Sequence, residues 1–242
     1  NNGALAKEAR FLGVQAHAGS APHKGVNALQ AATLAMAAIN ANRETFQDPD
    51  SIRVHPIITH GGDVVNAVPA EVRMEMFVRG RNMDAIADAD RKVDRALRAG
   101  AMAIGARVEI TSFSAYLPMK NHGALSDLYR ANAAQIVGQD GVTKAGPRGS
   151  STDMGDISHL MPTIQPYARG AAGTAHGADF VIEDYGLAVR NPAMATALTV
   201  FDLLSADGQA ERIINGFSPA LSKSQYLALQ RSLNRRQLYE DA

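Results

Sequence analysis

The sequence predicts an α/β protein of the α+β type, built on an antiparallel β-α-β-β-α-β unit. Apolar and polar residues alternate over residues 72–79, and apolar residues recur at helical spacing over residues 29–39 and 86–104. Turn-forming residues separate these segments. This order of segments matches the ferredoxin-like split unit, a scaffold that does not determine function by itself.

The first half of this unit follows from periodicity and turn residues. A short apolar run at residues 9–14 predicts a strand that ends in a polar loop at residues 17–25. A helix should follow, ending before residues 47–50, because apolar residues share one helical face: Leu29, Ala32, Met36 and Ile39. Alternating apolar residues then predict a strand ahead of the turn at residues 61–63, and a second strand at residues 72–79 pairs with it.

The second half begins with a helix for which Asn82 is the expected N-cap, and a strand at residues 107–113 closes the unit. Beyond it, the pattern is α/β but short. It comprises helices at residues 125–137 and 192–204, a Gly/Ser/Lys-rich loop at 138–151, a short apolar segment at 163–167 and a glycine-rich loop at 170–177. Tyr226, Leu229 and Leu233 give the polar tail one narrow helical face that could dock on the body.

We therefore expect a lid or dimerisation domain at residues 5–117, part of a catalytic domain at 118–206 and a polar helical tail at 207–242. The chain lacks an initiator Met, and its first three residues resemble a loop entered from sequence further upstream. The sequence is therefore expected to be a fragment.

Composition narrows the classes of function. Hydrophobic residues make up 46% of the chain, enough for a buried core, and 24 basic residues balance 24 acidic ones. This balance disfavours binding to nucleic acid or to an anionic membrane, and no apolar stretch approaches the roughly 20 residues that span a bilayer. Cysteine is absent, which excludes disulfides and thiolate ligands and fits a cytoplasmic location.

Three segments gather residues that a fold alone does not need. The first contains His17 among small residues at a strand end, where an imidazole could donate a hydrogen bond to a developing oxyanion. A loop histidine that only caps local backbone is the simpler alternative, and its prior is about two in three. The second contains Ser151 and Thr152, which could bind polar groups of a substrate, although capping of the next helix is favoured by local pattern.

The third segment, residues 170–177, has glycines and alanines around His176, its one strong ligand. This composition allows the backbone to approach a ligand or metal closely, while a flexible surface loop is equally compatible with it. One histidine cannot hold a metal, since three or four ligands are needed, so spacing alone leaves the metal undecided.

Taken together and in order, these motifs resemble the dinuclear-zinc amidohydrolase and exopeptidase superfamily, which includes aminoacylase, carboxypeptidase G and the auxin-conjugate hydrolases. The segment from Gly13 to Leu29 is similar to the opening of that family's lid domain. Gly61-Gly62-Asp63, with Asn66-Ala67-Val68-Pro69-Ala70 and the strand to Arg79, is similar to its next signature. The segments 151–158 and 173–177 are most similar to the aminobenzoyl-glutamate hydrolase branch.

The resemblance implies a role for several of these positions. His176 matches a metal ligand. His17 matches the lid histidine that, in dimeric relatives, reaches into the partner's active site and polarises the scissile carbonyl or stabilises the oxyanion. Asn66 and Arg79 match lid residues that bind the substrate's carboxylate, which a planar guanidinium suits. Ser151 and Thr152 are further candidates for binding the substrate.

The resemblance further implies a homodimer through the lid and a divalent metal, either two zinc ions or manganese, that activates water for attack on an amide. The implied substrate is a small amide with a carboxylate, such as aminobenzoyl-glutamate. The family's other metal ligands and its general base precede the lid and have no counterpart in this chain. A catalytically inactive dimerisation or binding module is therefore the alternative, and it predicts a stable dimer without metal dependence.

Overall fold

The computed structural model describes residues 1–144, 146–205 and 208–240. They form two compact units. Unit 1 comprises Asn1–Met119, Arg148–Asp156 and Lys223–Ala242, and unit 2 comprises Lys120–Pro147 and Ile157–Ser222. The chain thus returns to unit 1 twice, and the division assigns the last part of the predicted tail at residues 207–242 to that unit.

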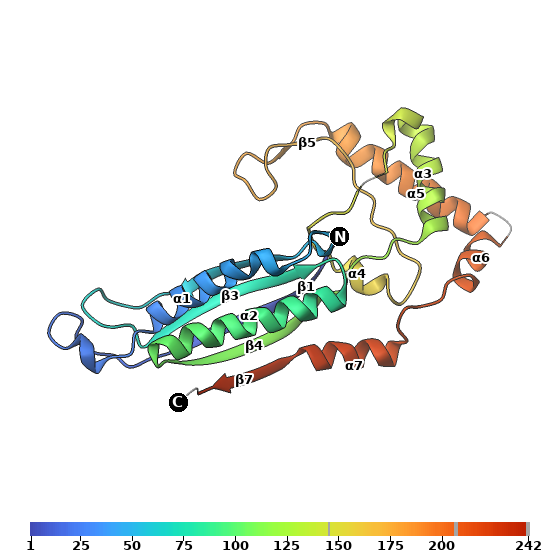
Figure 1. Ribbon diagram of the computed structural model, residues 1–242. Coiled ribbons are helices and arrows are strands. Elements are labelled where there is room, and N and C mark those ends of the chain that lie inside the picture. Colours follow the sequence, from blue (N-terminus) through green and yellow to red (C-terminus); the bar gives the residue numbers. More distant parts are fainter. Residues whose placement is uncertain (145, 206–207, 241–242) are drawn as a thin grey trace. The chain divides into compact units, whose positions relative to one another are not determined.

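Unit 1 is a five-stranded antiparallel sheet with two long helices on one face (Figure 1). Its strands stand in the order β2-β3-β1-β4-β7, and all neighbouring pairs are antiparallel. The bounds are β1 Gly3–Leu12, β2 Arg53–His60, β3 Glu71–Gly80, β4 Arg107–Tyr116 and β7 Arg235–Tyr239, with helices α1 Ala28–Ala41 and α2 Met83–Ile104. The predicted β-α-β-β-α-β order is confirmed.

β1 begins at Gly3 and ends at Leu12, whereas the apolar run predicts a strand at residues 9–14, so that prediction is wrong in its bounds. Lys7 breaks the apolar pattern of this segment, and yet its side chain is fully buried. It is buried because α2 supplies two carboxylates to it, Asp90 at 2.7 Å and Asp94. A charge neutralised by a distant helix cannot be recognised from strand periodicity.

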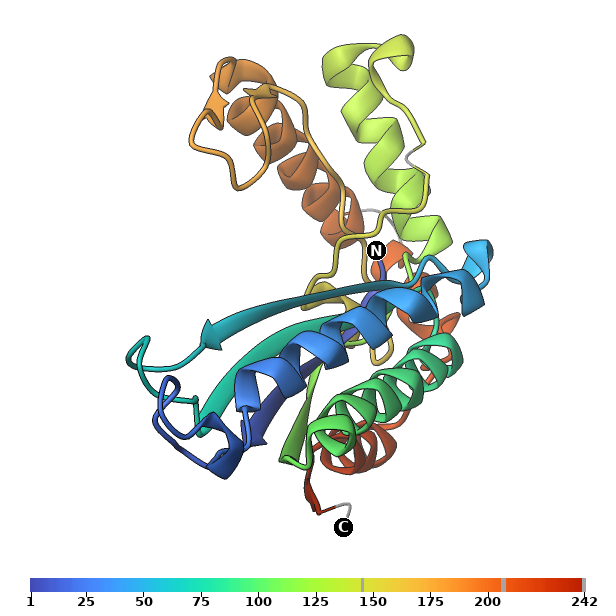
Figure 2. The same cartoon turned by 60° about the vertical axis from the view of Figure 1, so that its left-hand side comes forward.

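The core lies between the sheet and the two helices, as Figure 2 shows. β3 turns alternate side chains to this side, so the predicted apolar set is buried: Val72, Met74, Met76 and Val78. The helices pack closely at Gly100, where an added Cβ would lie 2.5 Å from the carbonyl oxygen of Ala31. α2 begins at the predicted N-cap, because the Asn82 side chain accepts a hydrogen bond from the backbone N–H of Ala85 at 2.8 Å. Asn27 caps α1 in the same way, accepting from the N–H of Leu29 at 3.0 Å.

The tail is helical only in part, contrary to the predicted helical tail at residues 207–242. Helix α6 spans Gln209–Asn215 and α7 spans Lys223–Leu233, but β7 then pairs with β4 as the last strand of the sheet. The side chains of β7 are largely exposed, and the strand is held by backbone pairing and ion pairs. Its sequence, RRQLY, therefore needs no alternation of apolar and polar residues and gives no signal for a strand.

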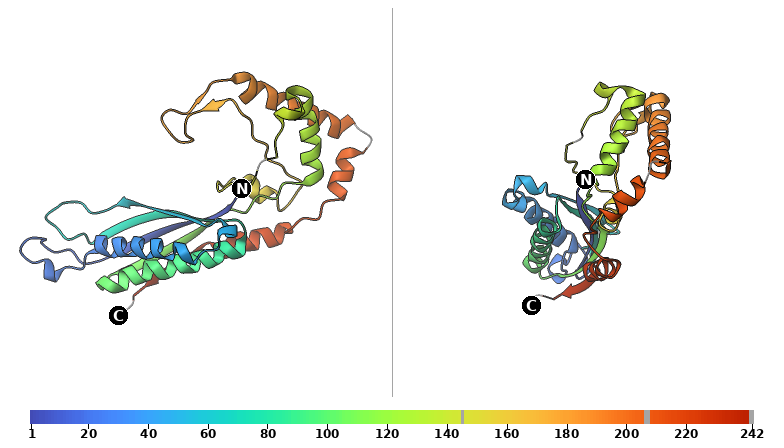
Figure 3. Two further views of the ribbon diagram at one scale, coloured as in Figure 1. Left: turned by 45° about the horizontal axis from the view of Figure 1, so that its top comes forward. Right: turned by 90° about the vertical axis from the view of Figure 1, so that its right-hand side faces the viewer.

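Unit 2 is built around helices α3, Gly123–Val137, and α5, Asn191–Ser205, which lie side by side (Figure 3). The buried Asn132 joins them by donating to Asp202 at 2.7 Å and to the hydroxyl of Thr199 at 3.4 Å. A two-stranded hairpin, β5 Ala171–Ala172 and β6 Val181–Ile182, precedes α5. The predicted apolar segment at residues 163–167 forms neither helix nor strand.

Short elements complete the structure. Helix α4, Met154–Ile157, follows the Ser151 and Thr152 motif, and a π-helical turn, Gly186–Arg190, leads into α5. Single 3-10 turns occur at Pro22–Lys24, Asn42–Thr45, Asp48–Asp50 and Gln139–Gly141. Within the ranges that the structure describes, no helix is long and apolar enough to cross a bilayer.

Candidate functional site

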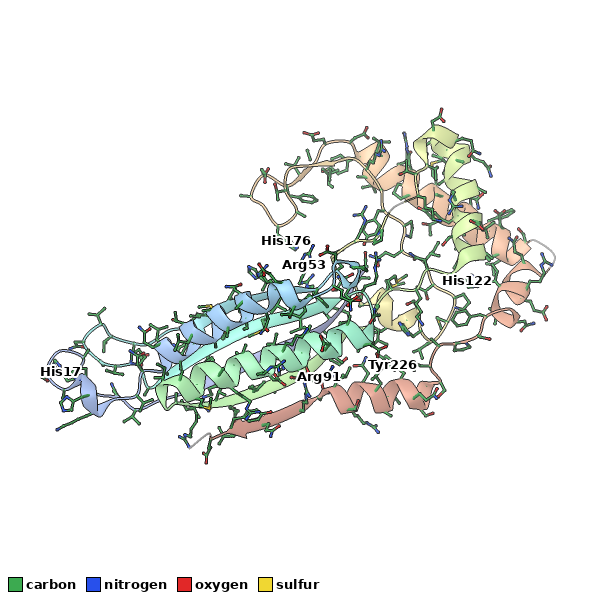
Figure 4. All side chains as sticks on the ribbon, viewed as in Figure 1. His17, Arg53, Arg91, His122, His176 and Tyr226 are labelled. Carbon is green, nitrogen blue, oxygen red and sulfur yellow. The ribbon has the colours of Figure 1, made fainter. Side chains whose placement is uncertain are left out.

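His17 lies in the loop that connects β1 to α1, and its imidazole is exposed (Figure 4). Its Nδ1 accepts hydrogen bonds from the backbone N–H groups of Gly19, at 3.1 Å, and Ser20, at 3.2 Å. A ring nitrogen that accepts from N–H donors carries no proton, so the proton of the neutral imidazole is on Nε2. The loop thus orients His17 and leaves an N–H donor directed away from the local backbone.

The structure brings His17 together with the Asn66 loop. The N–H of Ala18 donates to the carbonyl of Asn66 at 2.9 Å, and the N–H of Val68 donates to the carbonyl of Ala16 at 2.8 Å. His17 and Ala67 also form an isolated antiparallel bridge. Two predicted site residues, 49 positions apart in the sequence, therefore occupy one end of unit 1.

Arg79 lies at the opposite end of the sheet from this pair of loops. It is the penultimate residue of β3, whereas Asn66 precedes the first residue of that strand. Its side chain belongs to the sheet face without helices, and its guanidinium stands 5.0 Å from the centre of the Phe77 ring. Arg79 and Asn66 of one chain are therefore not neighbours, although both are candidates for the same substrate carboxylate.

Ser151 and Thr152 also belong to unit 1. The N–H of Asn2 donates to the carbonyl of Ser150 at 2.8 Å, and Ala4 pairs with Arg79, so the motif joins the end of the sheet that carries Arg79. The Thr152 hydroxyl accepts from the N–H of Met154 at 3.3 Å, which is the capping role weighed in the sequence analysis. The hydroxyl oxygen of Ser151 is buried without a hydrogen-bond partner.

His176 lies in unit 2, in the loop between β5 and β6. It is exposed and adopts a left-handed backbone conformation with φ of 66°, which costs energy for a residue other than glycine. Gly173 in the same loop has φ of 80°, and an added Cβ there would lie 2.3 Å from the carbonyl oxygen of Asp179. The glycine is therefore needed for the fold of the loop.

A metal site does not form from the residues described here. Across residues 1–144, 146–205 and 208–240, no three His, Cys, Asp or Glu side chains are placed to hold a metal ion. His176 could supply one imidazole ligand, and three or four are needed. The donor set of this chain therefore does not fit a complete metal centre, and no catalytic step is assigned to a metal held by this chain alone.

Two features of unit 1 are not predicted by the sequence motifs. One is Arg53 of β2, which stands directly opposite Arg79 in the sheet. The other is Asp156, whose carboxylate accepts from the N–H of Leu117 at 3.3 Å, from the Tyr226 hydroxyl at 3.3 Å and from the Gln230 amide at 2.8 Å. Burial, together with the adjacent Asp156 charge, raises the pKa of Tyr226. Neither feature has a local sequence signal, since each depends on residues brought together by the fold.

Comparison with known proteins gives three kinds of match. The family model described as a peptidase dimerisation domain matches residues 1–103. The Xaa-Arg dipeptidase of Mus musculus is 29% identical over 228 residues, which cover 90% of this chain and 52% of that protein. The chain thus spans about half the length of the curated relatives it matches.

Solved structures agree with the fold. The aminobenzoyl-glutamate utilization protein from Klebsiella pneumoniae is 26% identical with a TM-score of 0.50, and the match covers 62% of this chain and 38% of that one. The aminopeptidase PepT from Bacillus cereus is 21% identical with a TM-score of 0.58, covering 82% and 50%, and it supports the fold alone. The resemblance stated from the motifs is confirmed: residues 1–103 match the peptidase dimerisation domain, and the chain is similar to peptidases and amidohydrolases in sequence and in fold.

Proposed function

We propose that this chain is the lid and part of the catalytic domain of a dimeric, metal-dependent amidohydrolase that hydrolyses the amide bond of an N-acyl or N-aroyl amino acid. The observation that carries the proposal is the placement of the candidate residues at two ends of one sheet, with His17 and Asn66 at one end and Arg79 at the other.

The separation of the two ends exceeds the size of a small substrate. From Glu71 to Arg79 alone, β3 extends about 26 Å at the usual rise of a strand. One molecule of an N-acyl amino acid cannot contact both ends of one lid. A single active site that uses all three residues therefore needs two copies of the chain.

The sheet has two edge strands, β2 and β7. β7 is short and begins with Arg235 and Arg236, whereas β2 is longer and, among the described residues, pairs with β3 alone, so β2 is the edge better suited to a second copy. Helix α1, which connects β1 to β2, contains no charged residue, and Leu34 on it is 42% exposed. Pro56 removes one N–H from the β2 edge, so side chains of α1 are expected to contribute to the interface.

Pairing of two β2 edges about a two-fold axis is antiparallel. It places the start of one β2, beside Arg79, against the end of the second β2, which leads into the loop with Asn66. His17, in the loop between β1 and α1, pairs with that loop. The Asn66 loop also carries Val64, which is 57% exposed, and Val65, which is fully exposed. Exposed valines at the tip of the lid are suited to burial against the second copy.

In this site, formed by two copies, each of the three candidate residues has a chemical role. The Nε2–H of His17 donates a hydrogen bond to the oxygen that gains negative charge as the amide carbonyl is attacked. Arg79 of the other copy binds the substrate carboxylate through two parallel N–H donors. Asn66, beside His17, offers an amide that can both donate and accept.

The proposal includes a divalent metal, zinc or manganese, to which His176 contributes one imidazole. Its chemistry, when bound, is to activate water for attack on the amide. The remaining ligands are assigned to the part of the relatives that this chain does not match. We also predict a cytoplasmic location, because a chain without cysteine fits a reducing compartment.

The comparisons support two substrate types that share an amide next to a carboxylate. The mouse relative is named a dipeptidase for Xaa-Arg, and the Klebsiella pneumoniae structure is of an aminobenzoyl-glutamate utilization protein. We propose the second type, an amide such as aminobenzoyl-glutamate.

The test is hydrolysis of aminobenzoyl-glutamate by the intact enzyme with zinc or manganese, before and after His176→Ala. The proposal expects metal-dependent release of glutamate that the substitution abolishes. The alternative, a catalytically inactive dimerisation module, expects a stable dimer with no metal dependence and no hydrolysis. A dimer without hydrolysis under either metal would refute the enzyme and support the module.

A further inference from the structure

Arg53 and Arg79 are directly paired across β2 and β3. Residues directly opposite in an antiparallel pair point to the same face, with Cβ atoms about 5 Å apart. Like charges in this position are destabilising unless something neutralises them. A group that neutralises the two guanidinium charges is therefore expected close to the pair.

No carboxylate in the described part of the chain neutralises the pair. Among the described residues, neither Arg53 nor Arg79 forms an ion pair, and Asp48 and Asp50 of the neighbouring turn pair with neither. Arg53 donates through Nη1 to the carbonyl of Ile52 at 2.8 Å, which leaves most of its five N–H donors available. Arg79 contacts the face of the Phe77 ring, a contact that leaves the edge of its guanidinium free to bind an anion.

The surroundings of the pair also suit an anionic ligand. Arg53 borders an open groove of about 320 Å³ on the side of the sheet that carries the helices, whose lining includes Arg43 and one carboxylate, Asp48. The buried, unpartnered hydroxyl of Ser151 belongs to the same end of unit 1. The positive charge available to an anion on the face without helices is therefore that of Arg53 and Arg79 themselves.

Resting on the proposed function, we propose that Arg53 is a specificity-determining residue that binds a second carboxylate, so that the enzyme selects amides of acidic amino acids. Arg79 holds the α-carboxylate, and Arg53 holds the side-chain carboxylate of a residue such as glutamate. The same guanidinium repels the side chain of a dipeptide that ends in arginine, so this chain differs in preference from its Xaa-Arg dipeptidase relatives.

The experiment compares two ligands of equal shape, N-benzoyl-glutamate and N-benzoyl-glutamine, by titration calorimetry at low salt. The chain is expected to bind the glutamate compound about fivefold more tightly, the upper range for one exposed ion pair. Arg53→Gln should remove this preference, while Arg79→Gln should weaken binding of both ligands. Arg91→Gln is the matched control, since Arg91 is an exposed arginine whose ion pair, within the described residues, is with Asp88 on its own helix.

A preference for glutamate that survives Arg53→Gln would overturn the inference, as would equal or absent binding of the two ligands by the unmodified chain. Hydrolysis separates this result from the proposed function. An enzyme that cleaves both amides without preference refutes the role of Arg53 alone. A chain that binds with the predicted preference in an intact protein that cleaves neither amide refutes the proposed activity alone.

Discussion

Arg235 of β7 forms an ion pair with Asp90 of α2 and thereby ties the last strand of the sheet to a central helix. Asp90 also binds Lys7 of β1 at 2.7 Å, and Asp94 contacts both cations, Arg235 at 3.5 Å. We call Lys7, Asp90, Asp94 and Arg235 the ion cluster. It connects three segments that lie far apart in the sequence, so it fixes the path of the chain within unit 1.

Lys7→Met should strongly destabilise unit 1. The Lys7 side chain is fully buried, and its removal leaves the Asp90 and Asp94 carboxylates without their buried cation. Breaking a buried pair in this way costs about 3–5 kcal/mol, to be measured by urea unfolding. Lys24→Met, which removes an exposed lysine, is the control, and equal stability of the two variants would show that the ion cluster does not hold the fold.

Deletion of residues 235–242 should convert the proposed dimer into larger oligomers. The deletion replaces a short edge strand that begins with two arginines by the longer β4, whose unpaired N–H and C=O groups can pair with other chains. Light scattering after size-exclusion chromatography measures the mass. As a control, Arg236→Ala removes only the exposed ion pair with Glu109 and should keep the mass of the unmodified protein. A deletion variant of unchanged mass would contradict the assigned role of β7.

The Arg10–Glu71 pair should make stability depend on pH in the acid range. A hydrogen bond from Arg10, and then one from Arg73, lower the pKa of Glu71 from 4.5 to about 2. Between these values the unfolded state binds more protons, so this contribution is present above pH 4.5 and is lost as the pH falls toward 2. Since the pair lies on the solvent side of the sheet, we expect about 1 kcal/mol.

The measurement for this pair is the free energy of unfolding from pH 5 to the acid limit, for the unmodified chain and for Glu71→Gln. The difference between them should shrink as the pH falls. A difference that stays constant with pH would mean that the proton affinity of Glu71 does not change on folding.

Leu34→Asp should dissociate the dimer, because it places a charge on the uncharged outer face of α1 and, by symmetry, next to its copy. Sedimentation at micromolar concentration should show a monomer. Met102→Asp is the control, since Met102 is also apolar and is 60% exposed but lies on α2. Dissociation by Met102→Asp rather than Leu34→Asp would move the interface to the other helix.

Sequence periodicity predicts the two helices and the central strands. Each of these strands buries every second side chain, and each helix buries every third or fourth, so the apolar residues recur at those spacings. Periodicity is insufficient for β7 and for the start of β1. In both places ionic contacts with α2 replace apolar alternation, and those partners are distant in the chain. Charged side chains on a strand carry no local sign of the partner that neutralises them.

The candidate site shows the same limit. The motifs identified His17, Asn66 and Arg79 individually, but only the fold shows that the first two share one end of unit 1 and that Arg79 lies at the other. Arg53 resembles an ordinary exposed arginine until its register opposite Arg79 is known. The role proposed for Arg53 depends on two features of the sheet. The sequence predicts the pairing of β2 with β3, but it does not predict the register that sets Arg53 opposite Arg79.

The most direct test of the account is complementation between two inactive variants of the intact enzyme. His17→Ala removes the oxyanion donor and should lower kcat about 10²–10³-fold, and Arg79→Ala should raise KM for the carboxylate-bearing amide. If each site uses His17 from one copy and Arg79 from the other, mixed dimers contain one site with both residues intact. Mixing the two variants under conditions of subunit exchange should therefore restore hydrolysis to a sizeable fraction of that of the unmodified enzyme. Confirmed subunit exchange without recovery of activity would contradict a site shared between two copies.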